Sequence, residues 1–283
     1  MAEKSKILDR EEYIEQAHMF RAMAERINPS QPVQELLLML KQEILVTTRL
    51  PMAIDYLLAE LNHAGTMGTA MKRLGHYFTP FQTFLVEMAE ADVGRFDMQR
   101  ATTILAREAT FRSEGGSPAG MFFFQFEALS RNRLSYDTGL SAMSGDPVFN
   151  DDWTAWILQT RHRLGLVDLA DLVYVHSEFA RQRGNTETEE GVEPTILFGE
   201  REGRIALANR RREPLFFFAA LQRQLNYPKI PEPPKPDLAT ETIPKIVRQL
   251  EKIEVRLKLL EDEQREKGID LSKFYGRRAE PDE

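Results

Sequence analysis

The chain has 283 residues, of which 42% are hydrophobic, 29% are charged and none is cysteine, and its formal net charge is −7. This composition excludes a wholly disordered chain, and the absence of cysteine excludes disulfides, thiolate nucleophiles and cysteine-bound zinc. The longest apolar run, residues 215–221, is too short for a membrane helix, and the charged N-terminus lacks a secretory signal. We therefore expect a cytoplasmic protein without a membrane span, and the negative charge argues against general binding of nucleic acid.

Residues 1–145 predict a domain of amphipathic helices that pack as a bundle. Apolar residues from Tyr13 to Ile27 recur every three or four positions, which predicts a helix that Asp9 and Glu12 begin with a capping box. The same pattern predicts further helices from Ser30 through Leu45, from Pro51 to Leu61, over 66–77, from Pro80 to Met88 and from Asp97 to Phe111.

A glycine-rich break at 115–116 precedes the next helix, which is expected over 119–131. This segment carries Phe122, Phe123, Phe124 and Phe126 on several helical faces, and such a distribution is typical of a deeply buried helix. Residues 136–150 contain two glycines and an Asp-Pro pair, which indicate a loop.

Residues 146–227 predict a small α+β subdomain with a short antiparallel sheet. Runs rich in strand-forming residues occur at 172–175, 195–198 and 205–208, and a glycine-bearing loop between the last two indicates a hairpin. Helices over 153–164 and 214–225 would cover one face of this sheet, because an isolated hairpin is marginally stable. Residues 168–183 fit a helix equally well, so that their structure stays open.

The composition changes after Tyr227. The prolines of residues 228–240 predict an extended linker, and residues 241–268 predict a coiled-coil helix. The apolar residues of this helix alternate at spacings of three and four and form a seam, namely Ile243, Ile246, Leu250, Ile253, Leu257 and Leu260. Exposure of such a seam to water is unfavourable, so the helix is expected to fold back on its own chain, to self-associate or to bind another helix.

The tail, residues 269–283, places four apolar residues among charged ones. These residues form a candidate docking motif, namely Ile269, Leu271, Phe274 and Tyr275. We therefore expect a protein partner or self-association through residues 241–275. The sequence thus predicts a mainly α protein with a helical N-terminal domain, a small α+β subdomain and a C-terminal coiled-coil helix.

Two Glu-x-x-His pairs have the spacing that di-iron helical bundles use, namely Glu15 with His18 and Glu60 with His63. The apolar stripe of the first helix, however, places Glu15 and His18 opposite the core, where they could not share a buried metal. We therefore expect solvated polar faces at both pairs, with no metal and no cofactor.

Three pairs of titratable residues lie close together in the sequence and are candidates for acid–base catalysis. They are Asp151 with Asp152, Asp168 with Asp171, and His176 with Glu178. None of these pairs accompanies a phosphate-binding loop or a nucleophile elbow, and the chain contains neither motif. The sequence therefore assigns no catalytic residue.

Arg210, Arg211 and Arg212 follow the predicted hairpin and are a candidate contact for an anion. Because Glu200 and Glu202 neutralise part of this charge, nucleic-acid binding through the arginine-rich hairpin is an alternative rather than the main hypothesis. We expect a non-catalytic interaction or scaffold protein that assembles through its C-terminal arm. The other alternative is an enzyme whose site is assembled from residues distant in sequence.

Overall fold

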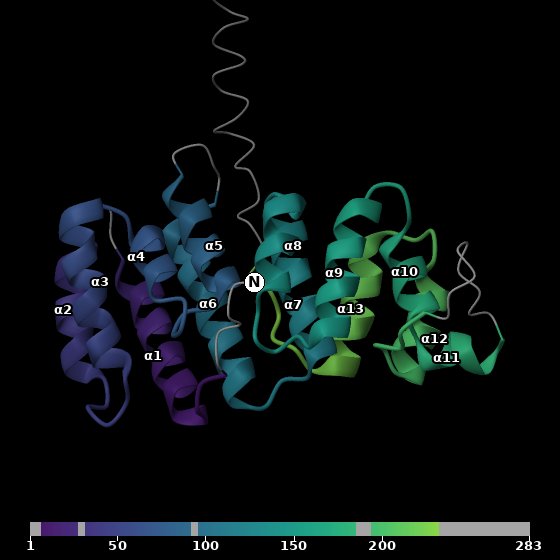
Figure 1. Ribbon diagram of the computed structural model, residues 1–283, viewed down its shortest axis with the longest axis horizontal. Helices are drawn as coiled ribbons and strands as arrows, with labels where there is room; N and C mark the ends of the chain where they lie inside the picture. The colour runs from purple at the N-terminus through teal and green to yellow at the C-terminus, as the bar shows by residue number, and fades with distance from the viewer. Residues whose placement is uncertain (1–6, 28–31, 92–95, 185–193, 232–283) are drawn as a thin grey trace, which may run out of the picture. The chain divides into compact units, whose positions relative to one another are not determined.

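The computed structural model of the chain describes residues 7–27, 32–91, 96–184 and 194–231 (Figure 1). The pattern of contacts divides the chain into two units, residues 1–232 and 233–283, and every described residue belongs to the first unit. The predicted coiled-coil seam from Ile243 to Leu260 and the tail motif from Ile269 to Tyr275 lie outside the described residues. They remain predictions from the sequence.

The described residues are mainly helical, which confirms this part of the prediction, and they form thirteen α-helices. Helices α1 to α7 span Arg10–Arg26, Val33–Glu43, Leu50–Ala64, Met67–Arg73, Pro80–Glu90, Met98–Ser113 and Pro118–Asn132. Helices α8 to α13 span Tyr136–Ser144, Asp151–Arg163, Leu169–Val175, Glu178–Gln182, Glu200–Asn209 and Pro214–Leu225. Within these described segments, every helix is too short or too polar to cross a membrane.

Short polar residues begin many of these helices. In α5, the Thr79 hydroxyl accepts a hydrogen bond from the Gln82 backbone N–H, and the Gln82 side chain accepts one from Thr79 in return. The capping box predicted at Asp9 is wrong, because the Asp9 side chain caps nothing. Glu12, its expected partner, is buried and contacts the backbone of Arg49 and the hydroxyl of Tyr77 instead.

Helices that follow one another in the chain pack side by side along most of the first unit (Figure 1). Helix α1 packs mainly against α6, α2 against α3, and α4 against α5, while α10, α12 and α13 pack together at the other end of the described sequence. One hydrophobic core extends through these helices, from Leu8 to Ile230. It continues across the domain boundary predicted at residue 145, since Phe122 of α7 packs on Trp153 and Trp156 of α9.

The predicted short sheet is wrong for the described residues, because they contain no strand. Residues 172–175 lie in α10 and residues 205–208 lie in α12, while 195–198 are extended and only Phe198 forms a single bridge, to Ser177. The segment 168–183 is helical, in α10 and α11. The expected hairpin glycine, Gly203, is inside α12, where a Cβ would overlap Ser177, so this glycine permits close packing and forms no turn.

The loop predicted over residues 136–150 is wrong in its first half, which forms α8. The Ser135 hydroxyl caps this helix at the Thr138 N–H. Gly139, which suggested a turn, lies within the helix, and a Cβ there would be 2.6 Å from Leu129 Cδ1 of α7. Gly139 thus permits a close approach of α8 to Leu129 of α7.

Candidate functional site

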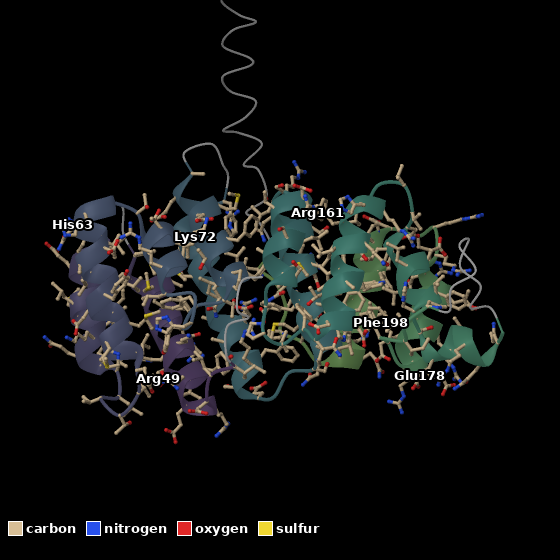
Figure 2. The ribbon with its side chains drawn as sticks, viewed as in Figure 1. Arg49, His63, Lys72, Arg161, Glu178 and Phe198 are labelled. Carbon is tan, nitrogen blue, oxygen red and sulfur yellow. The ribbon has the colours of Figure 1, made fainter. Side chains whose placement is uncertain are left out.

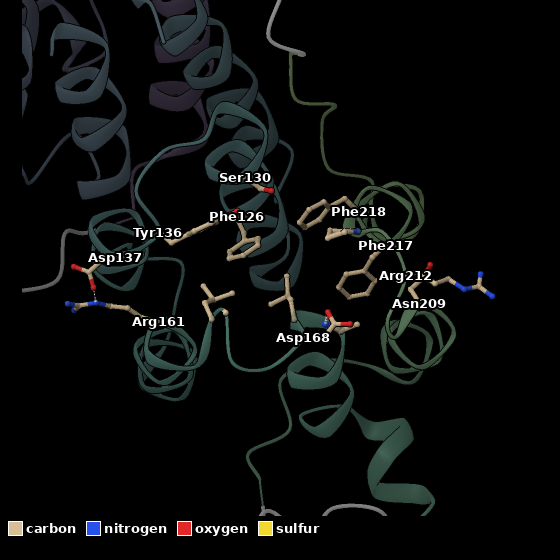
Figure 3. Close-up of a pocket in the computed structure, with 15 residues that line it drawn as sticks. Phe126, Ser130, Tyr136, Asp137, Arg161, Asp168, Asn209, Arg212, Phe217 and Phe218 are labelled. Carbon is tan, nitrogen blue, oxygen red and sulfur yellow. Dashed lines mark hydrogen bonds and ion pairs between the residues drawn. The ribbon is translucent and has the colours of Figure 1, made fainter. Parts of the chain in front are cut away.

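A cavity of about 480 Å³ lies among α7, α8, α9, α10, α12 and α13 (Figure 3). Its volume is within the range of roughly 300–1,000 Å³ that is typical of small-molecule sites. Phe126, Phe217 and Phe218 form much of its wall and point toward one another across it (Figure 3). The ring centroids of Phe126 and Phe218 are 6.0 Å apart, and Phe126 also stacks on Tyr136 at 5.5 Å.

The helical register explains how these side chains meet. Phe126 and Ser130 are four residues apart on α7 and therefore share one face, and Pro214 and Phe218 are related in the same way on α13. Leu164 and Gly165 line the cavity from the turn after α9. Gly165 has a φ of 90°, a conformation that glycine adopts without strain, so the turn depends on it.

Four charged residues line the cavity, namely Asp137, Arg161, Asp168 and Arg212. Arg161 of α9 forms an ion pair with Asp137 of α8 at 2.5 Å. Asp168 caps α10, and its carboxylate accepts hydrogen bonds from the backbone N–H groups of Ala170 at 3.1 Å and Arg211 at 3.0 Å. Arg212 completes the rim and is exposed.

The three arginines of the candidate anion contact lie in the turn between α12 and α13. Arg210 forms an ion pair with Asp171 at 2.5 Å, and its guanidinium lies 4.1 Å from the centre of the Tyr174 ring. Arg211 has a φ of 57° and uses its backbone N–H to fix the turn to Asp168. The structure thus gives the charge of Arg210 a partner and leaves Arg211 and Arg212 exposed.

Two of the candidate acid–base pairs serve as structural groups in the fold. Asp151 and Asp152 form the first turn of α9, which Asn150 caps through the Trp153 N–H at 2.9 Å. These carboxylates complement the positive end of the helix dipole. Asp168 is the cap of α10 described above, and its expected partner Asp171 pairs with Arg210.

His176 is buried at the corner between α10 and α11. Its Nδ1 donates a hydrogen bond to the Thr195 carbonyl at 2.8 Å, and its own carbonyl accepts from Leu197 and Phe198. Burial lowers the pKa of His176, the Thr195 carbonyl opposes this shift, and the charge of Arg163 adds to it. The neutral imidazole therefore holds the extended segment 195–198 in place.

The burial of neutral His176 predicts a loss of stability in weak acid. Because its pKa is lower in the folded state than the usual value of about 6.5, protonation favours the unfolded chain as pH falls below that value. We expect the free energy of unfolding in urea to decrease from pH 7.5 to pH 5.5, and His176→Gln to reduce this decrease. His162→Gln, which alters an exposed histidine, should leave the slope unchanged. An equal slope for wild type and His176→Gln would contradict the assignment.

The two Glu-x-x-His pairs form no common site. Glu15 is buried and accepts a hydrogen bond from the Leu45 N–H at 3.0 Å, so the expectation of a solvated Glu15 is wrong. The loop before α3 covers this carboxylate. His18 lies 3.6 Å from Glu43, and His63 is exposed on α3 (Figure 2). In the described part of the chain, no cluster of histidine and carboxylate side chains is arranged to hold a metal.

Buried and half-buried carboxylates hold backbone or tyrosine groups of their own chain. Glu90 accepts from the N–H groups of Met67 and Gly68 at 2.6 and 2.9 Å, and Glu127 accepts from the Tyr227 hydroxyl at 2.7 Å. Burial together with the nearby Glu127 carboxylate raises the pKa of Tyr227 far above its usual value. These tyrosine and glutamate side chains therefore act as fixed hydrogen-bonded joints between helices.

A buried ionic cluster joins α6, α7 and the loop after α8. Arg112 lies between Glu108, at 2.8 Å, and Asp146, which it contacts with both terminal nitrogens. The Gln125 amide donates to both carboxylates at 2.9 Å. Burial alone lowers the pKa of Arg112, but Asp146 and Glu108 raise it well above its usual value. Sequence reasoning missed this cluster, because Asp146 precedes a proline and resembled an ordinary turn residue.

Comparison with known proteins found no match: no family model, no curated protein and no solved structure is similar to this chain. The features that bear on function are therefore the sequence of the C-terminal arm, the roles of the buried charged groups and the apolar cavity.

Proposed function

We propose that this chain is a non-catalytic cytoplasmic interaction protein that self-associates through its C-terminal arm. One observation carries the proposal. The seam from Ile243 to Leu260 repeats over nearly three heptads, and a helix with such a seam gains stability only when the seam is covered.

The charges beside the seam favour pairing with a second copy. In the heptad register, Arg256 occupies a g position and Glu261 the following e position. In a parallel pair of identical helices, each Arg256 faces the Glu261 of the other copy, so that two attractive contacts form by symmetry. A fold-back onto the same chain would use neither of these contacts.

The roles of the titratable side chains in the first unit also support a non-catalytic protein. Asp168 and Asp171 fix the turn before α13, and neutral His176 is hydrogen bonded to the Thr195 carbonyl. A general base is a proton acceptor that must reach the substrate, and these groups are occupied by their own backbone and side-chain partners.

Nucleic-acid binding through Arg210, Arg211 and Arg212 remains the second candidate function. Arg211 and Arg212 are exposed on one turn, as phosphate contacts require. However, Asp171 pairs with Arg210 and Asp168 lies against the same turn, so the local charge is largely balanced. Retention on a DNA or RNA column at low salt, lost in Arg211→Glu, would favour this alternative.

The proposal is tested by light scattering on two variants that carry the same substitution. Leu257→Asp places a charge in the seam, whereas Leu259→Asp places it two residues away on the opposite side of the predicted helix. We expect wild type and Leu259→Asp to have a mass that is a multiple of the 32.6 kDa chain, and Leu257→Asp to have the mass of one chain. A buried aspartate in the seam lacks a partner, which disfavours association.

Two results would contradict the proposal. The first is a single-chain mass for wild type throughout a micromolar concentration series. The second is an equal effect of the two substitutions, since that would show that the surface charge rather than the seam controls assembly.

A further inference from the structure

The cavity beside Phe126, Phe217 and Phe218 has no role in the proposed self-association. It lies in the first unit, and its lining includes three phenyl rings and the aliphatic side chains of Leu164 and Leu169. Binding of an apolar group of fitting shape in an apolar cavity is favourable, because the group leaves water and displaces weakly held water from the cavity. The interior therefore favours a ligand with an apolar body.

The charges at the rim determine the ligand's charge. The charged residues of the lining are two arginines, Arg161 and Arg212, and two aspartates, Asp137 and Asp168, so that their formal charges cancel. The Asp137–Arg161 ion pair lies at one edge of the cavity and the Arg212 guanidinium extends away from the opposite edge (Figure 3). An anion attracted by Arg212 would be repelled by Asp168, and a cation attracted by Asp168 would be repelled by Arg212. This arrangement favours an uncharged ligand.

Two hydroxyl groups of the lining, those of Ser130 and Tyr136, form no hydrogen bond among the residues that the structure describes. Ser130 lies beside Phe126 in the wall (Figure 3). A hydroxyl both donates and accepts, so it satisfies one polar atom of a ligand. Phe126 and Phe217 are each only 3% exposed and give the cavity a rigid apolar wall. A rigid ring system loses less entropy on binding against such a wall than a flexible chain does.

We propose that this cavity binds an uncharged, ring-containing apolar small molecule that hydrogen bonds to Ser130 through a single polar group. This binding site adds to the proposed self-association and does not depend on it. The full-length chain with Leu257→Asp in the seam should therefore retain it.

The test compares two fluorescent probes with the same ring system. N-phenyl-1-naphthylamine is uncharged and has one N–H, whereas 1-anilinonaphthalene-8-sulfonate adds one negative charge. Titrated against the full-length chain, the uncharged probe should bind with one site per chain, and the sulfonate should bind at least tenfold more weakly. Equal affinities, or tighter binding of the sulfonate, would overturn the charge argument and with it the proposal.

Two substitutions locate the probe. Ser130→Phe fills the wall and should weaken binding of the uncharged probe at least tenfold, and Ser130→Leu, a smaller change that α7 accommodates more easily, should weaken it to an intermediate degree. Ser141→Phe is the matched control, because Ser141 lines a different depression between α5 and α8. Its affinity should equal that of wild type. Unchanged binding in both Ser130 variants, or loss in Ser141→Phe alone, would overturn the assignment.

Discussion

Replacing Arg112 by methionine is expected to lower the free energy of unfolding by about 3–5 kcal/mol, the usual cost of removing one partner from a buried ion pair. Arg112 is the only cation in contact with Glu108 and Asp146 among the described residues, and both carboxylates are fully buried. Without the guanidinium, two negative charges share a site from which water is excluded. One of them must then bind a proton or the helices must separate.

The measurement is urea unfolding of wild type and Arg112→Met at neutral pH. Arg21→Met, on the exposed side of α1, is the control and should change stability by less than about 0.5 kcal/mol. Combining Arg112→Met with Glu108→Gln and Asp146→Asn should recover part of the loss, because the triple variant buries no unpaired charge. A loss below about 1 kcal/mol for Arg112→Met would contradict the buried cluster.

The second large effect is expected for Phe122→Ala, which should cost about 3–5 kcal/mol, as do other truncations of buried phenylalanine. The Phe122 ring is fully buried and packs against Trp153, Trp156 and Phe198 at centroid distances of 5.9, 4.9 and 6.5 Å. This aromatic cluster joins α7 and α9 to the extended segment that carries Phe198, which Figure 2 labels. Removal of the ring leaves a cavity that these rigid neighbours cannot fill.

The protein provides its own reporter for this prediction. The chain has two tryptophans, Trp153 and Trp156, and both contact Phe122. Their emission should therefore change in the folded Phe122→Ala variant as well as in its unfolding transition. Phe216→Ala is the control, since the Phe216 side chain is 63% exposed, and it should alter neither stability nor emission appreciably. Equal destabilisation of the two variants would contradict the central position of Phe122.

Local patterns predicted much of the helical structure. The stripe from Tyr13 through Phe20 forms the buried face of α1, and the phenylalanines at 122–124 are fully buried in α7, as expected. Apolar runs of four residues carried less information. Residues 205–208 form part of a helix, because a run this short fits a strand and a buried helical turn equally well, and only packing of α12 against α10 and α11 decides between them.

The cavity and the ionic cluster could not be predicted from local patterns. Phe126, Leu164 and Phe217 are separated by some tens of residues and meet only because α7, α9 and α13 pack together. Asp146 gave a turn signal, and nothing in its neighbourhood indicates that Arg112 lies beside it. Glycine is ambiguous for a related reason. Gly139 and Gly203 are of a residue type typical of turns, but each lies inside a helix where a neighbouring segment packs closely.

Cysteine cross-linking through the arm tests the proposed self-association most directly, because the natural chain has no cysteine. Ile253→Cys places a thiol at a d position of the seam, and Val255→Cys places one at an f position on the outside of the same helix. Under mild oxidation, Ile253→Cys should give a covalent dimer of about twice the 32.6 kDa chain, and Val255→Cys should remain a single chain. Failure of Ile253→Cys to cross-link, or equal cross-linking of both variants, would contradict assembly through the seam.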